Sequence, residues 1–211
     1  MLQIECSLCH GKAALFHEID RKKYYKCTNC LSVLLHPAYY ISPEEERNRY
    51  REHNNDVEDS GYQKFVSPIV NSIKESYNTQ HIGLDFGSGT GPVITKLLRD
   101  EGYKIELYDP FFCDNPEKLT IQYDYIACCE VIEHFHCPEK EFRLLRSLLK
   151  PGGSLFCMTE VYSEDLDFVK WYYKNDSTHV FFYHVKAFNW IKSNLNYSKV
   201  IIDKRLITLI A

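Results

Sequence analysis

Residues 84–92 read Leu-Asp-Phe-Gly-Ser-Gly-Thr-Gly-Pro, and this stretch decides the fold. The apolar run Ile82 to Phe86 leads into three alternating glycines, and a helical pattern begins at Pro92. Glycines after a strand allow a tight turn and let a ligand approach the main chain closely. The pattern therefore predicts a strand, a ligand-binding turn and a helix, in that order.

The acid in this stretch narrows the class of ligand. Asp85 lies just before the glycines, where a carboxylate repels a pyrophosphate and attracts a ligand that carries an ammonium and a sulfonium group. The dinucleotide pattern G-x-G-x-x-G fails at its last position, which Pro92 occupies. Proline suits the first turn of a helix, because its missing N–H has no partner there. A purely structural glycine turn remains the alternative.

Composition limits the kind of protein. The chain has 211 residues and a net charge of −4, which indicates one sizeable core with a small appendage and no basic field for nucleic acid. No apolar run reaches the roughly 18 residues of a membrane span, so we expect no membrane partner. The first ten residues include Glu5 and lack an apolar core, so they do not resemble a signal peptide, and we expect a cytoplasmic location.

The nine cysteines indicate a metal site, because disulfides are rare in the cytoplasm. Two C-x2-C pairs stand 17 residues apart and comprise Cys6, Cys9, Cys27 and Cys30. Such pairs predict one tetrahedral zinc ion, and four thiolates leave no open position, so the zinc should be structural. A redox pair or an empty ribbon is the alternative. Cys128 and Cys157 lie in apolar runs and are expected to be small buried side chains.

The cysteine pairs predict a zinc ribbon over residues 1–40, with short strands over 13–19 and 22–26. His10 and His36 flank the pairs and are expected at the surface. The basic run at 21–26 is expected at a solvated hairpin tip, although it could also dock a partner. A largely helical linker or lid should follow over 41–79, with helices that begin at Ser42-Pro43 and at Tyr62.

From residue 80 the pattern alternates between strand and helix, which predicts an α/β domain over 80–211 with a doubly wound, Rossmann-like sheet. The strands are expected over 82–86, 104–108, 123–129, 154–161, 198–203 and 206–210. The helices are expected over 92–101, 138–150 and 185–193, with one more that ends at Trp171. Between Asp109 and Tyr123 only one turn fits, at 116–119, so the domain should be shortened after its second strand. Asp109, at the tip of that strand, is well placed to accept hydrogen bonds from ribose hydroxyls.

Several segments together resemble the class I S-adenosylmethionine-dependent methyltransferases. They are LDFGSGTG, the acid Asp109, YDYIACCEVIEHF and LKPGGSLFCMTEV, which cover residues 80–162, and KNDSTHVFFYHVKAFNWI extends the likeness. The cysteine pairs and an RYxxHxN pattern that begins at Arg49 are similar to a group of these enzymes with an N-terminal zinc ribbon.

The resemblance implies S-adenosylmethionine as cofactor. The implied cofactor-binding residues are Asp85, Phe86, Gly87, Ser88, Gly89, Gly91, Asp109, Pro110 and Glu130. Asp85 and the glycine backbone would hold the methionine part, Asp109 the ribose, and Glu130 would lie near the methionine or the transferred methyl group. The acid that usually follows a third strand has no counterpart here, so Phe111, Phe112 or Asp114 is expected at the adenine.

The acceptor side is less defined. The resemblance implies methyl transfer to an oxygen, nitrogen or carbon of a small molecule, and the candidate bases are His134, His179 and His53. Each histidine equally suits a cap or a hydrogen bond. Five aromatic residues near His179 are expected either to line an acceptor pocket or to belong to the core. They are Tyr172, Tyr173, Phe181, Phe182 and Tyr183. A non-catalytic scaffold, or an RNA or protein methyltransferase that docks through the ribbon, are the alternatives.

Overall fold

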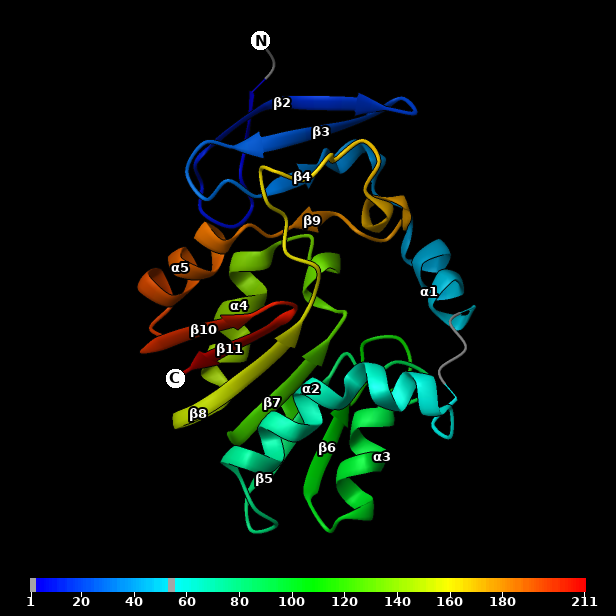
Figure 1. The fold of residues 1–211 in the computed structure, drawn as a ribbon, viewed down its shortest axis with the longest axis vertical. Coiled ribbons are helices and arrows are strands. Elements are labelled where there is room, and N and C mark those ends of the chain that lie inside the picture. Colours follow the sequence, from blue (N-terminus) through cyan, green and yellow to red (C-terminus); the bar gives the residue numbers. More distant parts are fainter. Residues whose placement is uncertain (1–2, 53–55) are drawn as a thin grey trace.

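The structure is a computed structural model that describes residues 3–52 and 56–211, and its framework is two β-sheets (Figure 1). The larger sheet has six strands in the order β10-β11-β8-β7-β5-β6. Their bounds are β5 Ile82–Phe86, β6 Lys104–Tyr108, β7 Tyr123–Cys129, β8 Leu149–Met158, β10 Lys199–Asp203 and β11 Leu206–Ile210. Strands β5, β6, β7 and β8 are parallel to one another. The C-terminal hairpin β10–β11 extends the sheet, and β11 pairs antiparallel with β8.

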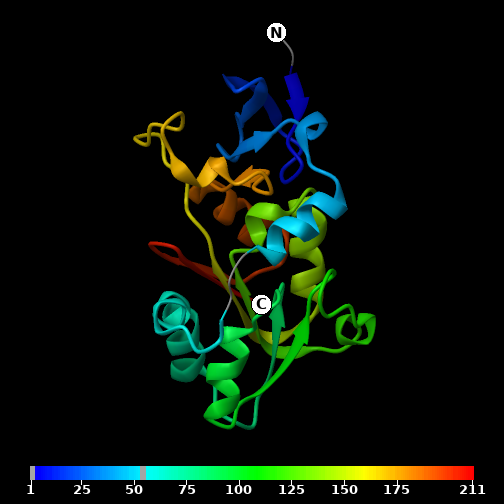
Figure 2. The same cartoon turned by 90° about the vertical axis from the view of Figure 1, so that its right-hand side faces the viewer.

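Helices cover both faces of this sheet. On one face lie α2 (Ser60–Ser76) and α3 (Val93–Asp100), and on the other α4 (Pro138–Ser147) and α5 (Val185–Asn194) (Figures 1 and 2). The central strand β7 shows why: Tyr125 and Ala127 belong to the core under α2 and α3, whereas Ile126 and Cys128 belong to the core under α4. Successive side chains of a strand point to opposite faces, so an all-apolar strand is covered twice.

The connection between β6 and β7 is as short as the sequence predicts. It contains one 3-10 turn, η2 (Pro116–Leu119), and no helix. At its start the chain reverses at once, because Asp109 and Cys113 exchange two backbone hydrogen bonds of 3.1 and 3.0 Å. As a result β6 is the edge of the sheet, and the residues after it stay close to the ends of β5 and β6.

The smaller sheet has five strands in the order β1-β2-β3-β4-β9. Four belong to the N-terminal segment: β1 Gln3–Glu5, β2 Lys12–Ile19, β3 Lys22–Cys27 and β4 Val33–Leu35. The fifth, β9 (Phe181–Phe182), comes from the far end of the chain and pairs Val33 with Phe182 and Leu34 with Phe181. The division at residues 40 and 79 stays a prediction, but the N-terminal sheet draws one strand from the segment 80–211.

Helix α1 (Pro43–Arg51) follows the N-terminal strands and lies at one side of the molecule (Figure 1). It begins as predicted: the Ser42 hydroxyl accepts from Glu45 N, and the Glu45 carboxylate accepts from Ser42 N. This reciprocal cap satisfies two backbone donors at the helix start. His53 lies outside the described residues. Among those described, no helix is both long and apolar enough to cross a bilayer.

Three predicted elements differ from the structure. The strand expected over 154–161 is β8, which begins at Leu149 and ends at Met158. The expected helix that ends at Trp171 is absent from residues 163–171, which form turns before the short η4 (Tyr172–Asn175). Phe168 and Trp171 are buried there against aromatic side chains of the N-terminal sheet and β9, and this packing overrides the helical pattern. Helix α4 ends at Ser147 instead of 150, because Leu149 already pairs with Tyr123 in the large sheet.

Candidate active site

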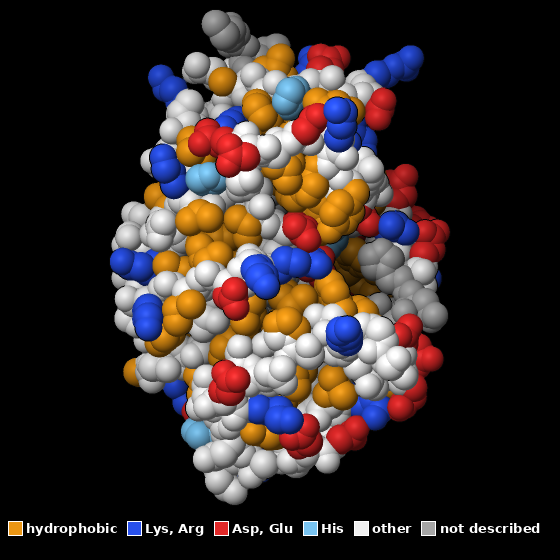
Figure 3. Space-filling model, viewed as in Figure 1, with side chains coloured by type: hydrophobic (Ala, Val, Ile, Leu, Met, Phe, Trp, Pro, Cys, Tyr) orange, Lys and Arg blue, Asp and Glu red, His pale blue; other side chains and the backbone are white. Residues whose placement is uncertain are grey.

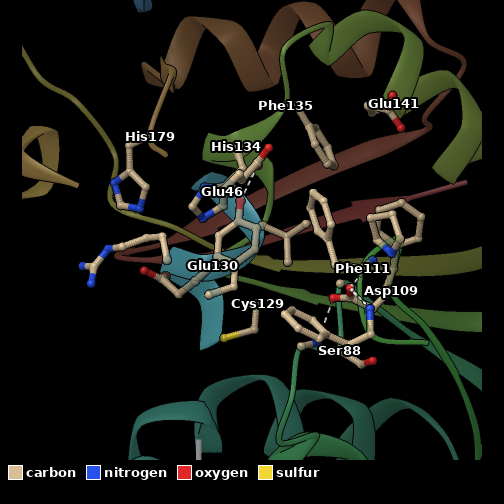
Figure 4. A pocket seen from close by; sticks show the side chains of 18 of the residues that line it. Glu46, Ser88, Asp109, Phe111, Cys129, Glu130, His134, Phe135, Glu141 and His179 are labelled. Carbon is tan, nitrogen blue, oxygen red and sulfur yellow. Dashed lines mark hydrogen bonds between the residues drawn. The ribbon is translucent and has the colours of Figure 1, made fainter. Parts of the chain in front are cut away.

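A cavity of about 1200 Å³ lies at the carboxyl ends of β5, β6 and β7. Helices α1, α2 and α4 (Pro138–Ser147) and the segment 172–179 form its other walls. Figure 4 shows Ser88, Asp109 and Phe111 on one side of this cavity and His134 and His179 on the other. Parallel α/β sheets place ligand sites at these strand ends, so the cavity is the candidate active site.

The glycine turn forms one wall of the cavity. Gly87 and Gly89 have φ angles of 77° and 63°, a region that favours glycine. Gly87 N donates to Tyr108 O over 2.8 Å, which ties the turn to the end of β6. A Cβ atom on Gly87 would lie 2.4 Å from Val131 Cγ2, so a larger residue fits neither the backbone nor the packing.

Asp109 is anchored by the turns on both of its sides. Its Oδ2 atom accepts from Gly89 N over 2.9 Å, and its Oδ1 accepts from the backbone N–H groups of Phe111 and Phe112 over 2.8 and 3.0 Å. The residue is 6% exposed and lines the cavity. Three backbone donors fix the direction of the carboxyl group, and its remaining lone pairs are available to a ligand.

Asp85 lies next to the glycine turn but does not line the large cavity. It is 4% exposed, and its Oδ2 accepts from the Thr95 hydroxyl over 2.8 Å. It lines a small adjoining cavity of about 30 Å³ that shares Gly87 and Cys129 with the large one. Burial raises the pKa of Asp85 to about 6, although the Thr95 hydrogen bond opposes the shift. A cation above the glycine turn would offset this burial.

Glu130 follows the last residue of the central strand β7 in a strained conformation, with a φ of 52°. Its Oε1 accepts from Arg205 Nη2 over 2.8 Å, and its Oε2 accepts from the Tyr173 hydroxyl over 3.2 Å. Burial raises the pKa of Glu130, and the neighbouring Glu133 carboxylate adds to the increase. The two partners fix the direction of this carboxyl group, and Glu130 lines the cavity.

A group of polar side chains lies at the end of the cavity opposite Asp109. Glu133 is fully buried, and its Oε1 accepts from the Tyr173 hydroxyl. His179 Nε2 lies 4.0 Å from the same oxygen, and the rings of His134 and His179 are 4.8 Å apart. Burial raises the pKa of both Glu133 and Tyr173. Two of the three predicted bases therefore lie side by side, next to an acid that the sequence reasoning passed over.

The aromatic residues near His179 divide between cavity and core. Tyr172 and Tyr173 line the cavity. Phe181, Phe182 and Tyr183 are at most 1% exposed and belong to the core between the two sheets. Of these five aromatic residues, only Tyr172 and Tyr173 are placed to contact an acceptor. Phe111 and Phe112 line the cavity beside Asp109, whereas Asp114 is not among its lining residues.

Most of the predicted cofactor residues meet at one place. The cavity is lined by Phe86, Gly87, Ser88, Gly89, Asp109, Pro110 and Glu130, and by the candidate bases His134 and His179. Asp85 and Gly91 line the small adjoining cavity. Arg205, which sits between β10 and β11 and neutralises Glu130, was missed, because a turn arginine far along the chain carries no local signal.

The four paired cysteines form a separate buried cluster in the N-terminal segment. Their Sγ atoms all lie within 4.8 Å of one another, with Cys6 and Cys30 at 3.7 Å and Cys9 and Cys27 at 3.4 Å. His10 stays outside the cluster: its two ring nitrogens contact Glu5 and Glu139, each at 2.6 Å. These contacts bind the cysteine segment to α4.

Comparisons with known proteins agree with this architecture. A family model described as "Methyltransferase domain" matches residues 49–200. The ubiquinone biosynthesis O-methyltransferase of Escherichia coli O7:K1 is 31% identical over 77 residues, which are 36% of this chain and 32% of that protein. The enzyme of the same name from Pseudomonas savastanoi is 30% identical over 77 residues, 36% of this chain and 33% of its own. The match thus spans about a third of these curated relatives.

Solved structures share the fold at low identity. An O-methyltransferase family protein from Burkholderia thailandensis has a TM-score of 0.55 at 13% identity, over 78% of this chain and 61% of its own. Human N-acetylserotonin methyltransferase, solved with S-adenosylmethionine, has a TM-score of 0.53 at 12% identity, over 82% of this chain and 57% of its own. The predicted Rossmann-like class I fold is confirmed.

Proposed function

This chain belongs to the methyltransferase domain family, and from that premise we propose that it transfers a methyl group from S-adenosylmethionine to a small-molecule acceptor. The observation that carries the proposal is the cavity itself. Asp109, held by three backbone donors, lines the cavity, and so does Glu130, which follows the central strand β7. The ubiquinone biosynthesis enzymes in the comparison favour an oxygen as the methylated atom.

The size of the cavity supports two ligands. Its volume of about 1200 Å³ exceeds the roughly 300–1000 Å³ of a pocket for one drug-sized molecule. We place the cofactor between the glycine turn and Asp109, with its adenine against Phe111 or Phe112. The acceptor then occupies the end near His134 and His179, and Glu130 stands between the two ligands.

The residues of this cavity would act mainly by orientation and electrostatics. The bound sulfonium supplies an electrophilic methyl group, and the side chains have only to align the acceptor atom with it. Asp85 and Asp109 place carboxyl groups beside a cationic donor, whereas Glu130 is already paired with Arg205. Tyr50, Tyr62 and Phe65 line the cavity from α1 and α2 and would exclude water. His134 or His179 would accept the proton of a hydroxyl acceptor.

We further propose that the four-cysteine cluster is a structural zinc site. A zinc ion with Zn–S bonds of about 2.3 Å requires sulfurs about 3.8 Å apart. The observed Sγ separations of 3.4 and 3.7 Å fit that requirement. A Cβ on Gly11 would lie 3.2 and 3.3 Å from two of these sulfurs, so glycine leaves room for the thiolates. Four thiolates close the shell, which makes the site structural.

Calorimetry with S-adenosylhomocysteine tests the cofactor proposal. We expect one site at micromolar concentration in the wild type. Asp109→Ala should weaken it at least tenfold, because the ribose loses its carboxylate. Asp114→Ala, which alters a nearby acid that does not line the cavity, should bind like the wild type. The proposal is wrong if the wild type shows no heat of binding up to high micromolar ligand. It is also wrong if Asp109→Ala binds the ligand as tightly as the wild type.

A further inference from the structure

His134 and His179 are both oriented by backbone carbonyls. His134 Nδ1 lies 3.0 Å from Thr178 O, and His179 Nδ1 lies 2.7 Å from Tyr173 O. A carbonyl oxygen only accepts, so each Nδ1 carries the proton. In the neutral ring the lone pair is then on Nε2. A carbonyl that fixes the tautomer in this way is the usual second-sphere partner of a metal-binding histidine.

Glu133 completes the group from the same short segment as His134. Its side chain is fully buried, and its Oε2 atom has no hydrogen-bond partner among the described residues, although Oε1 accepts from Tyr173. A buried carboxylate oxygen without a partner is costly, and native proteins rarely leave one so. One ligand atom from each of Glu133, His134 and His179 lies within 4.8 Å of the other two.

Two hydrogen bonds join the two segments that carry these three side chains. Val180 N donates to Glu133 O over 3.0 Å, and the Tyr183 hydroxyl donates to Ile132 O over 2.9 Å. These bonds hold the segment that carries His179 against the segment that carries Glu133 and His134. Ligand atoms at about 2.1 Å from a metal ion lie about 3 Å apart, so binding requires side-chain shifts of about 1–2 Å.

We propose that Glu133, His134 and His179 bind one divalent transition-metal ion at the acceptor end of the cavity. Two imidazoles and one carboxylate suit manganese, iron, cobalt or zinc better than magnesium or calcium, which prefer all-oxygen shells. Three protein ligands leave positions open to a ligand from the cavity, which both histidines line. This site is distinct from the cluster of four cysteines, whose shell is closed.

The position of the ion defines the class of acceptor, an inference that rests on the proposed function. The Tyr173 hydroxyl contacts both Glu130 and Glu133, so the ion lies one side chain away from the expected methyl group. It would bind an acceptor hydroxyl and lower the pKa of that group. With both histidines bound to the ion, the ion replaces them as the group that promotes loss of the hydroxyl proton. The proton leaves to water, the oxygen bonds to the methyl carbon, and the C–S electron pair stays on sulfur. The acceptor is therefore an alcohol or a phenol.

Manganese titration of the full chain loaded with a single equivalent of Zn²⁺ tests the site, because the four thiolates bind that equivalent and leave the second site open. Mn²⁺ is the probe because thiolate shells retain Zn²⁺ against it. The paramagnetic resonance signal of free Mn²⁺ counts the bound ions, and we expect one per chain. Glu133→Gln, His134→Ala and His179→Ala should each weaken binding at least tenfold. His136→Ala is the control, because its ring stacks on Tyr40 outside the group, and it should bind like the wild type.

Binding of S-adenosylhomocysteine by the same variants shows that they are folded and separates the two proposals. A wild type that binds S-adenosylhomocysteine but not Mn²⁺ overturns the metal site and leaves the proposed function standing. Equal Mn²⁺ binding by the folded Glu133→Gln and His134→Ala variants also overturns it. A wild type that binds Mn²⁺ through these residues but no S-adenosylhomocysteine supports the site and refutes the proposed function.

Discussion

At the scale of single residues, Asp85 suits ligand binding but destabilises the folded protein at neutral pH. Burial raises its pKa from 3.8 to about 6, so the folded protein holds this proton up to pH of about 6 while the unfolded chain releases it near pH 4. The stability that the protonated form contributes is present below pH 4 and is lost as the pH rises through 6. At neutral pH the buried charge therefore destabilises the fold.

Asp85→Asn should relieve this cost. The amide oxygen still accepts from Thr95, and no charge is buried, so the free energy of unfolding at pH 7.5 should rise by about 2–3 kcal/mol. Urea unfolding at pH 4 and pH 7.5 measures the effect. The wild type should lose more stability than the variant between these two values. If the two proteins show the same change with pH, Asp85 does not titrate as the geometry indicates.

The same carboxyl group should make cofactor binding depend on pH. A ligand with an ammonium group needs Asp85 in its ionised form, so affinity for S-adenosylhomocysteine should rise up to pH of about 6 and level off above it. Below that value the affinity should fall up to tenfold per pH unit. Calorimetry between pH 5 and 7.5 measures the slope. Asp85→Asn should bind weakly with a smaller slope, and an unchanged slope would contradict the prediction.

At the scale of elements, helix α1 is joined to the wall that carries His179. Arg49 Nη2 donates to Asp176 Oδ2 over 2.8 Å and its Nε donates to the same oxygen over 3.2 Å, while the Asp176 side chain is 14% exposed. Asp176 in turn accepts from Thr178 N and Thr178 Oγ1. A helix outside the sheet therefore helps to hold the acceptor end of the cavity.

Arg49→Met should loosen both partners without unfolding the protein. Loss of a half-exposed, two-donor ion pair should lower stability by about 1 kcal/mol or less. Hydrogen exchange should become faster in residues 43–51 and 172–179 and stay unchanged in β7. Arg47→Met, on the exposed side of the same helix, is the control. Equal exchange in the two variants would show that the ion pair does not couple helix and wall.

At the scale of the whole molecule, the N-terminal sheet and the cavity are one structure. Strand β4 begins three residues after Cys30, the last paired cysteine, and it pairs with β9, which begins two residues after His179. In Figure 3 acidic and basic side chains alternate across the visible face, with apolar side chains exposed around its middle. The charges thus form no common field on this face. Strand pairing, a shared core and the His10–Glu139 contact link the two parts.

Removal of zinc should therefore destabilise more than the N-terminal segment. A strong zinc chelator, or Cys6→Ser, should lower the melting temperature of the whole chain by about 10 °C in a single transition. Hydrogen exchange around 176–183 should become faster, because β9 loses its partner strand. Re-addition of Zn²⁺ to the chelated wild type is the control. A melting transition of the large sheet that ignores the chelator would show that the two parts are independent.

The sequence by itself determined what depends on neighbours in the chain. The bounds of β5, β6 and β7 follow from apolar runs that end in glycines or acids, and the structure reproduces all three. The single turn at 116–119 follows from a connection too short for a helix. The cysteine spacing brings four sulfurs together because each C-x2-C pair is a local turn. Asp109 reaches the cavity because it ends a strand beside the glycine turn.

Only the tertiary structure decided what depends on distant segments. Arg205 meets Glu130 and β9 meets β4 across 75 residues or more, and no local pattern encodes either contact. Burial of Phe168 and Trp171 under a second sheet replaced an expected helix with turns. Apolar periodicity reports that a side chain is buried, but not against which partner. For the same reason the grouping of Glu133, His134 and His179 emerged only once the chain was folded.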